Sequence, residues 1–334
     1  MRSVNIVPGD SGACAHYRLI QVGNLLQYMA KDVNISPAGK FRALNNAIIY
    51  TQRITTETTM KQLIDFKKST NSKFIVDYDD LVWVYNNETV PEYNNCKYKI
   101  DADGNTISMS KYLDELTDNI TVSTPMLKEA LSSFVSDPNK ILIMPNRLSY
   151  REWYFPRTNG IPKEDIFYYA GSSTHYDNNR KLQGDFETSM INYLNNKKVL
   201  VKGSVPYFIK PSATFPANML NSYAVNFYKE TRYCKFIIAP LVNNIFNKCK
   251  SNLKYLESCA VGRVCLVSDF PGSPFEDAHP YQKIPLGSTR QAIEFIVERA
   301  SKNYEEILNY QYEYLNKRWL DNSIGDYVKL LELE

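Results

Sequence analysis

Short apolar runs alternate with segments of helical periodicity along the whole chain. In the first half, runs long enough for a buried strand lie at 4–7, 47–50, 73–76, 120–123 and 141–144. Between them, segments such as 16–29 and 58–67 carry apolar residues at helical spacing. In the second half, strands are expected at 166–170, 199–201, 236–239 and 264–267, and helices at 185–194, 251–260, 291–300 and 304–315. This alternation predicts an α/β protein with parallel sheets.

A stretch at 155–162 with two Pro residues and one Gly divides this pattern into two units. Each unit opens with a strand followed by a small-residue loop, at 9–15 and at 171–175. Ligands of open parallel sheets bind at the carboxyl ends of the strands. We therefore expect two Rossmann-like domains whose opening loops face a central cleft.

Composition limits the class of protein but does not identify its activity. A length of 334 residues suits two domains, and 44% apolar residues suffice for a core. The net charge of +3 neither indicates nor excludes a nucleic-acid partner. Six cysteines without a CxxC pair and only three histidines argue against a zinc site and favour reduced thiols. With no signal-peptide core and no apolar run of membrane-spanning length, we expect a cytoplasmic protein.

The most informative segment runs from 239 to 268. Its pattern is a strand, a polar loop, a helix that begins near Lys250 and Ser251, a stop at Gly262 and another strand. Ser251 is a candidate N-cap. A helix N-terminus and nearby lysines attract a diphosphate, and Glu257 could accept hydrogen bonds from both ribose hydroxyls. The alternative is an ordinary amphipathic helix with solvated charges.

This segment, APLVNNIFNKCKSNLKYLESCAVGRVCLVS, resembles the donor site of the retaining GT-B glycosyltransferases called group 1. The stretches GACAHYRLIQVGNLL, FIVDYDDLVW, ITVSTPMLKEAL, ILIMPN and FYYAGSSTHYDNN are similar to other parts of that family, in the same order. The resemblance covers most of the chain and is most specific in the C-terminal segment.

The resemblance implies the GT-B fold, with an acceptor domain at 1–158, a donor domain at 159–305 and a helix at 306–334 that packs back on the N-terminal domain. It places the ribose at Glu257 and the diphosphate beside the start of the helix. The donor-binding residues it implies are Gly12, Gly171, Ser172, Arg180, Lys181, Asn247, Lys248, Lys250, Ser251, Asn252 and Glu257. Many relatives carry an acidic residue at the position of Cys249, so the transferred sugar stays open.

The implied activity is transfer of a hexose or pentose from a nucleoside-diphosphate sugar to an acceptor hydroxyl, with retention of the anomeric configuration. The implied donor is a UDP-sugar. The resemblance implies no metal and no other cofactor. His16, Asp79 and His175 are candidate catalytic residues, because they lie in expected cleft loops. Arg18 and Asp80 are candidates for acceptor contacts. Each of these residues also has a structural alternative. Asp79 and Asp80 could be strand-end caps, His16 and His175 could be structural histidines, and Arg18 could be an ion-paired arginine.

The acceptor is the least defined part of this interpretation. Asn- and Tyr-rich members of the family resemble bacteriophage proteins, and some phage members glycosylate 5-hydroxymethylcytosine, which admits double-stranded DNA as a partner. The alternatives are a surface glycan, a lipid-linked sugar, or a GT-B domain that binds a nucleotide sugar without catalysis. A Rossmann-type oxidoreductase is disfavoured, because the dinucleotide fingerprint is missing. We expect a monomer or a homodimer.

Overall fold

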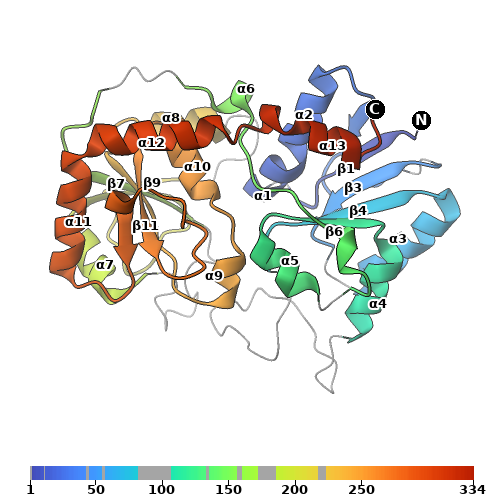
Figure 1. Cartoon of the computed structure of the whole chain (residues 1–334), viewed down its shortest axis with the longest axis horizontal. Coiled ribbons are helices and arrows are strands. Elements are labelled where there is room, and N and C mark those ends of the chain that lie inside the picture. The colour runs from blue at the N-terminus through green and yellow to red at the C-terminus, as the bar shows by residue number, and fades with distance from the viewer. Residues whose placement is uncertain are drawn as a thin grey trace.

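The computed structural model describes residues 2–10, 12–42, 45–54, 57–81, 107–132, 135–155, 160–171, 186–216 and 223–334, without the side chains of 107–111. In this part of the chain, the strands form two six-stranded sheets, one in each half, and all strand pairs are parallel. Helices cover the sheets, and the two halves form separate lobes that lie side by side (Figure 1). The predicted pair of parallel α/β domains is confirmed.

The N-terminal sheet has the strand order β2-β1-β3-β4-β5-β6. Its strands are β1 (Val4–Val7), β2 (Val33–Ile35), β3 (Ile48–Gln52), β4 (Lys73–Tyr78), β5 (Asn119–Val122) and β6 (Ile141–Ile143). Its helices are α1 (Ala13–Ala15), the π-helix η1 (His16–Ile20), α2 (Gln21–Tyr28), α3 (Glu57–Thr70), α4 (Ile107–Leu116), α5 (Pro125–Ser132), η2 (Pro138–Lys140) and α6 (Tyr150–Trp153). Every residue of β1 and β3 is buried, as expected for strands covered on both faces.

The C-terminal sheet has the order β12-β11-β10-β7-β8-β9. Its strands are β7 (Ile166–Gly171), β8 (Lys198–Gly203), β9 (Ala213–Phe215), β10 (Phe236–Ala239), β11 (Val264–Asp269) and β12 (Lys283–Pro285). Its helices are α7 (Thr188–Leu194), α8 (Tyr223–Thr231), α9 (Ile245–Cys249), α10 (Leu253–Ala260), η5 (Pro280–Gln282), α11 (Arg290–Lys302) and α12 (Tyr304–Asn316). Successive strands are added on one side of β7 as far as β9 and then on its other side from β10 onward. The boundary between β7 and β10 is therefore a topological switch point, where open parallel sheets bind ligands.

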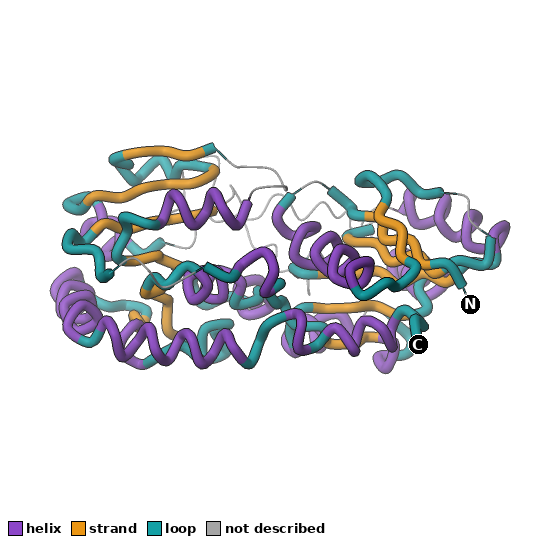
Figure 2. Tube along the Cα trace, turned by 90° about the horizontal axis from the view of Figure 1, so that it is seen from above, coloured by secondary structure: helices purple, strands orange, loops and turns teal. Residues whose placement is uncertain are grey.

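The C-terminal segment returns to the N-terminal domain (Figures 1 and 2). It consists of η6 (Leu320–Asn322) and α13 (Ile324–Leu330). Leu320, Ile324 and Tyr327 share a buried cluster with β1 and α2, and the Leu320 amide donates to the Leu148 carbonyl at 2.9 Å. The expected return of a C-terminal helix is therefore confirmed. The predicted boundary at 306 falls inside α12, which packs on the C-terminal domain, and the boundary at 158/159 lies outside the described residues.

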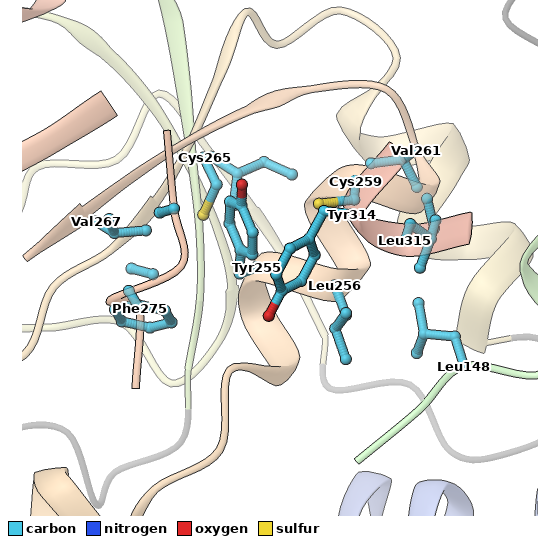
Figure 3. Close-up of a cluster of buried hydrophobic side chains, with 14 of the residues drawn as sticks. Leu148, Tyr255, Leu256, Cys259, Val261, Cys265, Val267, Phe275, Tyr314 and Leu315 are labelled. Atoms are coloured by element: carbon cyan, nitrogen blue, oxygen red, sulfur yellow. The ribbon is translucent and has the colours of Figure 1, made fainter. Parts of the chain in front are cut away.

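The two domains also share one hydrophobic cluster. Leu148 and Trp153, from the N-terminal half, pack in the same buried group as Leu256 of α10 and Leu315 of α12. Figure 3 shows Leu148 beside these C-terminal side chains. Tyr17 of η1 belongs to the same cluster, so the first helical segment of the chain contacts the core of the opposite domain.

Several elements differ from the sequence prediction. Helix α9 replaces part of the expected polar loop, because the Asn244 side chain caps it by accepting from the Asn247 amide at 2.8 Å. Helix α10 has Asn252, and not Ser251, at its N-cap. The edge strands β2, β9 and β12 have three residues each, too few for a periodic signal.

Candidate functional site

A cavity of about 740 Å³ lies between the domains and is lined by both. From the N-terminal side, its wall includes the loop after β1 and the ends of β3 and β4, through Asp10, Gly12, Arg53, Asp79 and Asp80. From the C-terminal side, it includes the ends of β7, β8 and β10 and the start of α10, through Gly171, Lys202, Ala239, Lys250 and Ser251. The carboxyl ends of both sheets therefore face one space, as open parallel sheets place their ligands.

Glu257 of α10 lies on the C-terminal wall and is only 3% exposed. Its carboxylate accepts a 2.5 Å hydrogen bond from the Tyr17 hydroxyl, and the Tyr223 hydroxyl is a second partner. Burial raises the pKa of Glu257 to about 7, although the two tyrosines and the charges of Lys254 and Lys202 act in the opposite direction. The site therefore holds a buried carboxylate that can accept further hydrogen bonds.

Three lysines bring positive charge to the same wall. Lys202 is buried at the end of β8 and forms an ion pair with Glu230 at 2.8 Å. Lys250 precedes α10 and lies 4.8 Å from the ring centre of Phe246, whereas Lys254 lies 5.1 Å from that of Tyr169. Together with the N-terminus of α10, they make this wall suitable for an anionic group.

The ends of β7 and β8 leave no room for side chains. A Cβ atom at Gly203 would lie 2.6 Å from the carbonyl oxygen of Gly171, and Gly203 has a φ of +84°, which glycine adopts without strain. The Ser204 amide donates to the same carbonyl at 3.0 Å. Two glycines thus let the backbone line the cavity at the switch point of this sheet.

Hydrogen bonds join the domains at the edge of the cavity. The Asn146 side-chain amide donates to the Ser251 hydroxyl at 2.6 Å, and the Thr124 hydroxyl donates to the Cys249 carbonyl at 3.0 Å. Asn252 does not cap its own helix with its side chain; instead, its amide donates to the Tyr314 hydroxyl at 2.6 Å. The start of α10 is therefore held by contacts from two other parts of the chain.

The N-terminal wall carries carboxylates around one arginine. The Arg53 guanidinium donates to both oxygens of Asp79, at 2.6 and 2.8 Å, and to Asp80 at 3.2 Å. Burial opposes ionisation of Asp79, but Arg53 outweighs it and lowers the pKa of that carboxyl. Burial and the charge of Asp79 raise the pKa of Asp80, whose side chain is 30% exposed. Asp80 is therefore the more available proton acceptor of the two.

Behind this wall, Arg18 and Asp77 form a buried ion pair. The shortest contact joins Nη2 of Arg18 to Oδ1 of Asp77 at 2.6 Å, and the Thr121 hydroxyl donates to the same oxygen at 2.5 Å. Arg18 also donates to Asn146 at 3.0 Å and to the Met144 carbonyl. Burial lowers the pKa of Arg18, but Asp77 outweighs it and raises the value, so the guanidinium stays charged.

His16 lies in η1 beside Tyr17 and is 7% exposed. Its Nε2 is 2.6 Å from a Glu152 oxygen of α6, and its Nδ1 is buried without a hydrogen-bond partner in the described part of the chain. His16 does not belong to the cavity wall. Its contacts tie the first helical segment to the 149–153 segment.

The described residues contain neither a cluster of metal ligands nor a helix that could span a membrane. Within these ranges, no three His, Cys, Asp or Glu side chains come together as a set of metal ligands. None of the helices in the same ranges combines the length and the hydrophobicity that crossing a bilayer requires.

Solved structures resemble the chain over its full length. HepE from Anabaena in complex with UDP-glucose matches with a TM-score of 0.64 at 7% identity, covering 99% of this chain and 100% of HepE. A glycosyltransferase from Rickettsia africae matches with a TM-score of 0.58 at 12% identity, covering 99% of this chain and 98% of its own. WaaG, a glycosyltransferase involved in lipopolysaccharide biosynthesis, matches with a TM-score of 0.56 at 10% identity and 99% coverage of both chains.

The chain has the GT-B fold. No protein-family model matches the sequence, and no curated protein matches it either. The likeness at these identities therefore concerns the arrangement of the two domains, and the roles of individual residues depend on the geometry of the site.

The cavity of this GT-B fold brings together part of the predicted set. The predicted residues on its wall are Gly12, Asp79, Asp80, Gly171, Lys250, Ser251 and Glu257. Five others lie off the wall, namely His16, Arg18, Asn247, Lys248 and Asn252. Ser172, His175, Arg180 and Lys181 lie outside the described residues. The functional roles of all these residues stay predictions.

The structure adds wall residues that the sequence interpretation did not select. Tyr17, Arg53, Lys202 and Tyr223 line the cavity. Arg53 and Lys202 had a usable signal, because each lies where a parallel strand ends. Tyr17 and Tyr223 had no such sequence signal, because Glu257, which both contact, is distant from them in the sequence.

Proposed function

We propose that the protein is a glycosyltransferase that takes its sugar from a UDP-sugar bound in the interdomain cavity. The observation that carries the proposal is the position of Glu257. This buried carboxylate lies on the cavity wall, with Lys250 and Lys254 nearby on the same wall. HepE, which shares the fold, was solved with UDP-glucose, and this supports UDP as the nucleotide.

The ribose would bind at Glu257, whose oxygens can accept hydrogen bonds from two vicinal hydroxyls. The diphosphate would lie at the start of α10, near Ser251 and Lys250, where a helix dipole and a cation both favour negative charge. Gly171 and Gly203 would allow close approach of the nucleotide to the strand ends. Gly12, across the cavity, would leave space beside the phosphates.

Transfer breaks the bond between the anomeric carbon and the diphosphate, and UDP leaves with additional negative charge. Lys250 and Lys254 would stabilise this charge in a partly enclosed cavity. These cations could serve without a bound metal, and UDP release in the presence of EDTA tests this point. Retention of configuration is proposed from the resemblance of the 239–268 segment, and the anomeric configuration of the product, read by NMR, tests it.

The acceptor would bind against the N-terminal wall. Asp80 has the exposure and the raised pKa that suit a hydrogen bond to an attacking hydroxyl, and Arg53 would hold Asp79 and Asp80 in place. The described part of this wall has three carboxylates, those of Asp10, Asp79 and Asp80, around Arg53. Such a wall suits a polyhydroxylated acceptor and repels a phosphate backbone. We therefore propose a glycan hydroxyl as the acceptor, with a DNA base as the competing outcome.

The test is UDP release from a panel of UDP-sugars, first without an acceptor. We expect slow release by the wild type and none by Glu257→Ala. Lys198→Ala changes an exposed lysine at the other end of β8 and should behave as the wild type. Binding without release would favour a domain that binds the sugar nucleotide without catalysis. Absence of both binding and release would contradict the proposal.

Acceptor class is then read by mass spectrometry after incubation with oligosaccharides, lipid-linked sugars, and DNA with or without hydroxymethylcytosine. A mass increase of one sugar on a glycan supports the proposed acceptor. An increase confined to hydroxymethylated DNA would overturn it and favour the base-modifying alternative.

A further inference from the structure

The carboxylate proposed to bind the ribose is held by a residue of the opposite domain. The Tyr17 hydroxyl, from η1 of the N-terminal domain, donates to Oε1 of Glu257 at 2.5 Å, and both side chains are almost fully buried. The two residues are 240 positions apart in the sequence. Tyr223 of α8 supplies the second hydroxyl from the same domain as Glu257.

Tyr17 is fixed in place. Its ring centre lies 6.0 Å from that of Trp153 and 6.1 Å from that of Tyr223, the latter at an interplanar angle of 88°. Its backbone carbonyl accepts a hydrogen bond from Gln21 at 2.9 Å. The π-helical turn adds a residue to the helix and so changes the direction of the side chains that follow. A ligand would therefore meet Tyr17 as a rigid neighbour of Glu257.

A carboxylate can accept about four hydrogen bonds. Two tyrosine hydroxyls leave capacity for the two hydroxyls of a ribose. Tyr17 can thus remain bound to Glu257 when a nucleotide binds, and it need not be displaced.

We propose that Tyr17 is a positioning residue, whose hydrogen bond holds the Glu257 carboxylate in the orientation that accepts the ribose. The proposal rests on the proposed function. It makes the donor site depend on both domains, because the C-terminal domain alone lacks the Tyr17 hydroxyl. Separation of the domains would then weaken donor binding without any change in the C-terminal residues.

Several other groups act on the charge of Glu257. Besides Tyr17, they are Tyr223 of α8, Lys254 of α10 and Lys202, which is paired with Glu230. Burial and the charge of Glu257 in turn raise the pKa of Tyr168 of β7 and of Cys265 of β11. Burial and the charge of Glu257 raise the pKa of Tyr17 well above its ordinary value, so Tyr17 stays a hydrogen-bond donor at neutral pH. Loss of its hydroxyl removes a bond to the charged form and shifts the titration of Glu257 upward.

The test is the affinity for UDP-glucose across pH, measured by calorimetry on the full-length chain. For the wild type, affinity should fall as the pH drops below about 7, where Glu257 takes up a proton. For Tyr17→Phe, the same fall should occur about one pH unit higher, so that affinity is several-fold weaker near pH 7 and recovers near pH 8.5. Tyr223→Phe is a second variant with the same expected direction.

Tyr304→Phe is the matched control, because this buried tyrosine donates to the Lys235 carbonyl and does not line the cavity. It should reproduce the wild-type profile. If Tyr17→Phe has the wild-type profile, or weakens binding equally at every pH, Tyr17 acts only in packing and the proposal fails. If the wild type itself does not bind UDP-glucose, the proposed function fails instead.

Discussion

Asn146 and Ser251 are hydrogen-bonded across the boundary between the two domains, with 2.6 Å between the side-chain amide and the hydroxyl. The same amide group accepts a 3.0 Å bond from Arg18 through its oxygen. Asn146 thus connects the buried ion pair behind the N-terminal wall with the start of the helix that carries Glu257. A polar chain of this kind fixes the relative position of the two walls.

Asn146 lies on the cavity wall, and its replacement by Ala should weaken donor binding. Loss of the bond to Ser251 allows the start of α10 to move, and we expect about a 5-fold to 10-fold higher Kd for UDP, from the loss of about 1 kcal/mol. Calorimetric titration checks this value. Asn196→Ala, on the surface and bonded to the Asn192 carbonyl, is the control. An unchanged Kd for Asn146→Ala would show that this contact is irrelevant to the donor site.

Replacement of Asp77 by Ala should strongly destabilise the N-terminal domain. The change leaves the buried Arg18 guanidinium without its counter-ion, which costs about 3–5 kcal/mol. Urea denaturation followed by tryptophan fluorescence measures the loss. Asp65→Ala removes an exposed carboxylate on α3 and should change stability by less than about 0.5 kcal/mol. Equal midpoints for the two variants would be incompatible with a buried ion pair.

Lys250 should contribute to transfer more than to folding. Its ammonium group lies on the cavity wall, where it can stabilise charge on the departing UDP. We expect Lys250→Met to lower kcat/KM by about 10-fold to 100-fold, while the melting temperature stays close to that of the wild type. Lys198→Met, at the exposed start of β8, provides the comparison. Similar kinetics for the two variants would remove Lys250 from the donor site.

Glu257 should reduce the stability of the ligand-free protein above neutral pH. Its pKa is about 7 in the folded chain and about 4.3 in the unfolded chain. Between these values the unfolded chain releases the proton and the folded chain retains it, so stability falls as the pH rises through this window. The contribution is on the order of 3–4 kcal/mol. Urea midpoints of the wild type and Glu257→Gln at both ends of the window test it: the drop with pH should be smaller in the variant.

The sequence predicted those parts of the fold that depend on local patterns. The buried runs around β1, β4, β10 and β11 and the helical periodicity of α11 and α12 were sufficient for two parallel sheets. The position of Glu257 on the cavity wall was also predictable, because its strand–helix–strand frame is contiguous. Helix α9 was missed because a single side-chain cap at Asn244 decides between helix and loop.

The composition of the cavity wall was harder to predict. Arg53 and Lys202 lie at strand ends, which the sequence indicates, but only the folded chain brings them close to their partners, Asp79 in one case and Glu230 in the other. Arg18 illustrates the reverse case. Its sequence position left both an acceptor contact and an ion pair open, and the structure bonds its guanidinium to Asp77 and Asn146 behind the wall. Pairing with residues distant in the sequence, and not the residue type, decides whether an arginine or lysine lies on the cavity wall or behind it.

The most direct test of the proposed donor site is a calorimetric titration of UDP into the wild type and Glu257→Ala, with circular dichroism as a check of folding. We expect the wild type to bind UDP and the folded variant to bind it about 100-fold more weakly or not at all, because two hydrogen bonds to a buried carboxylate are lost. Equal affinity of the two proteins for UDP would contradict the assignment of the interdomain cavity as the donor site.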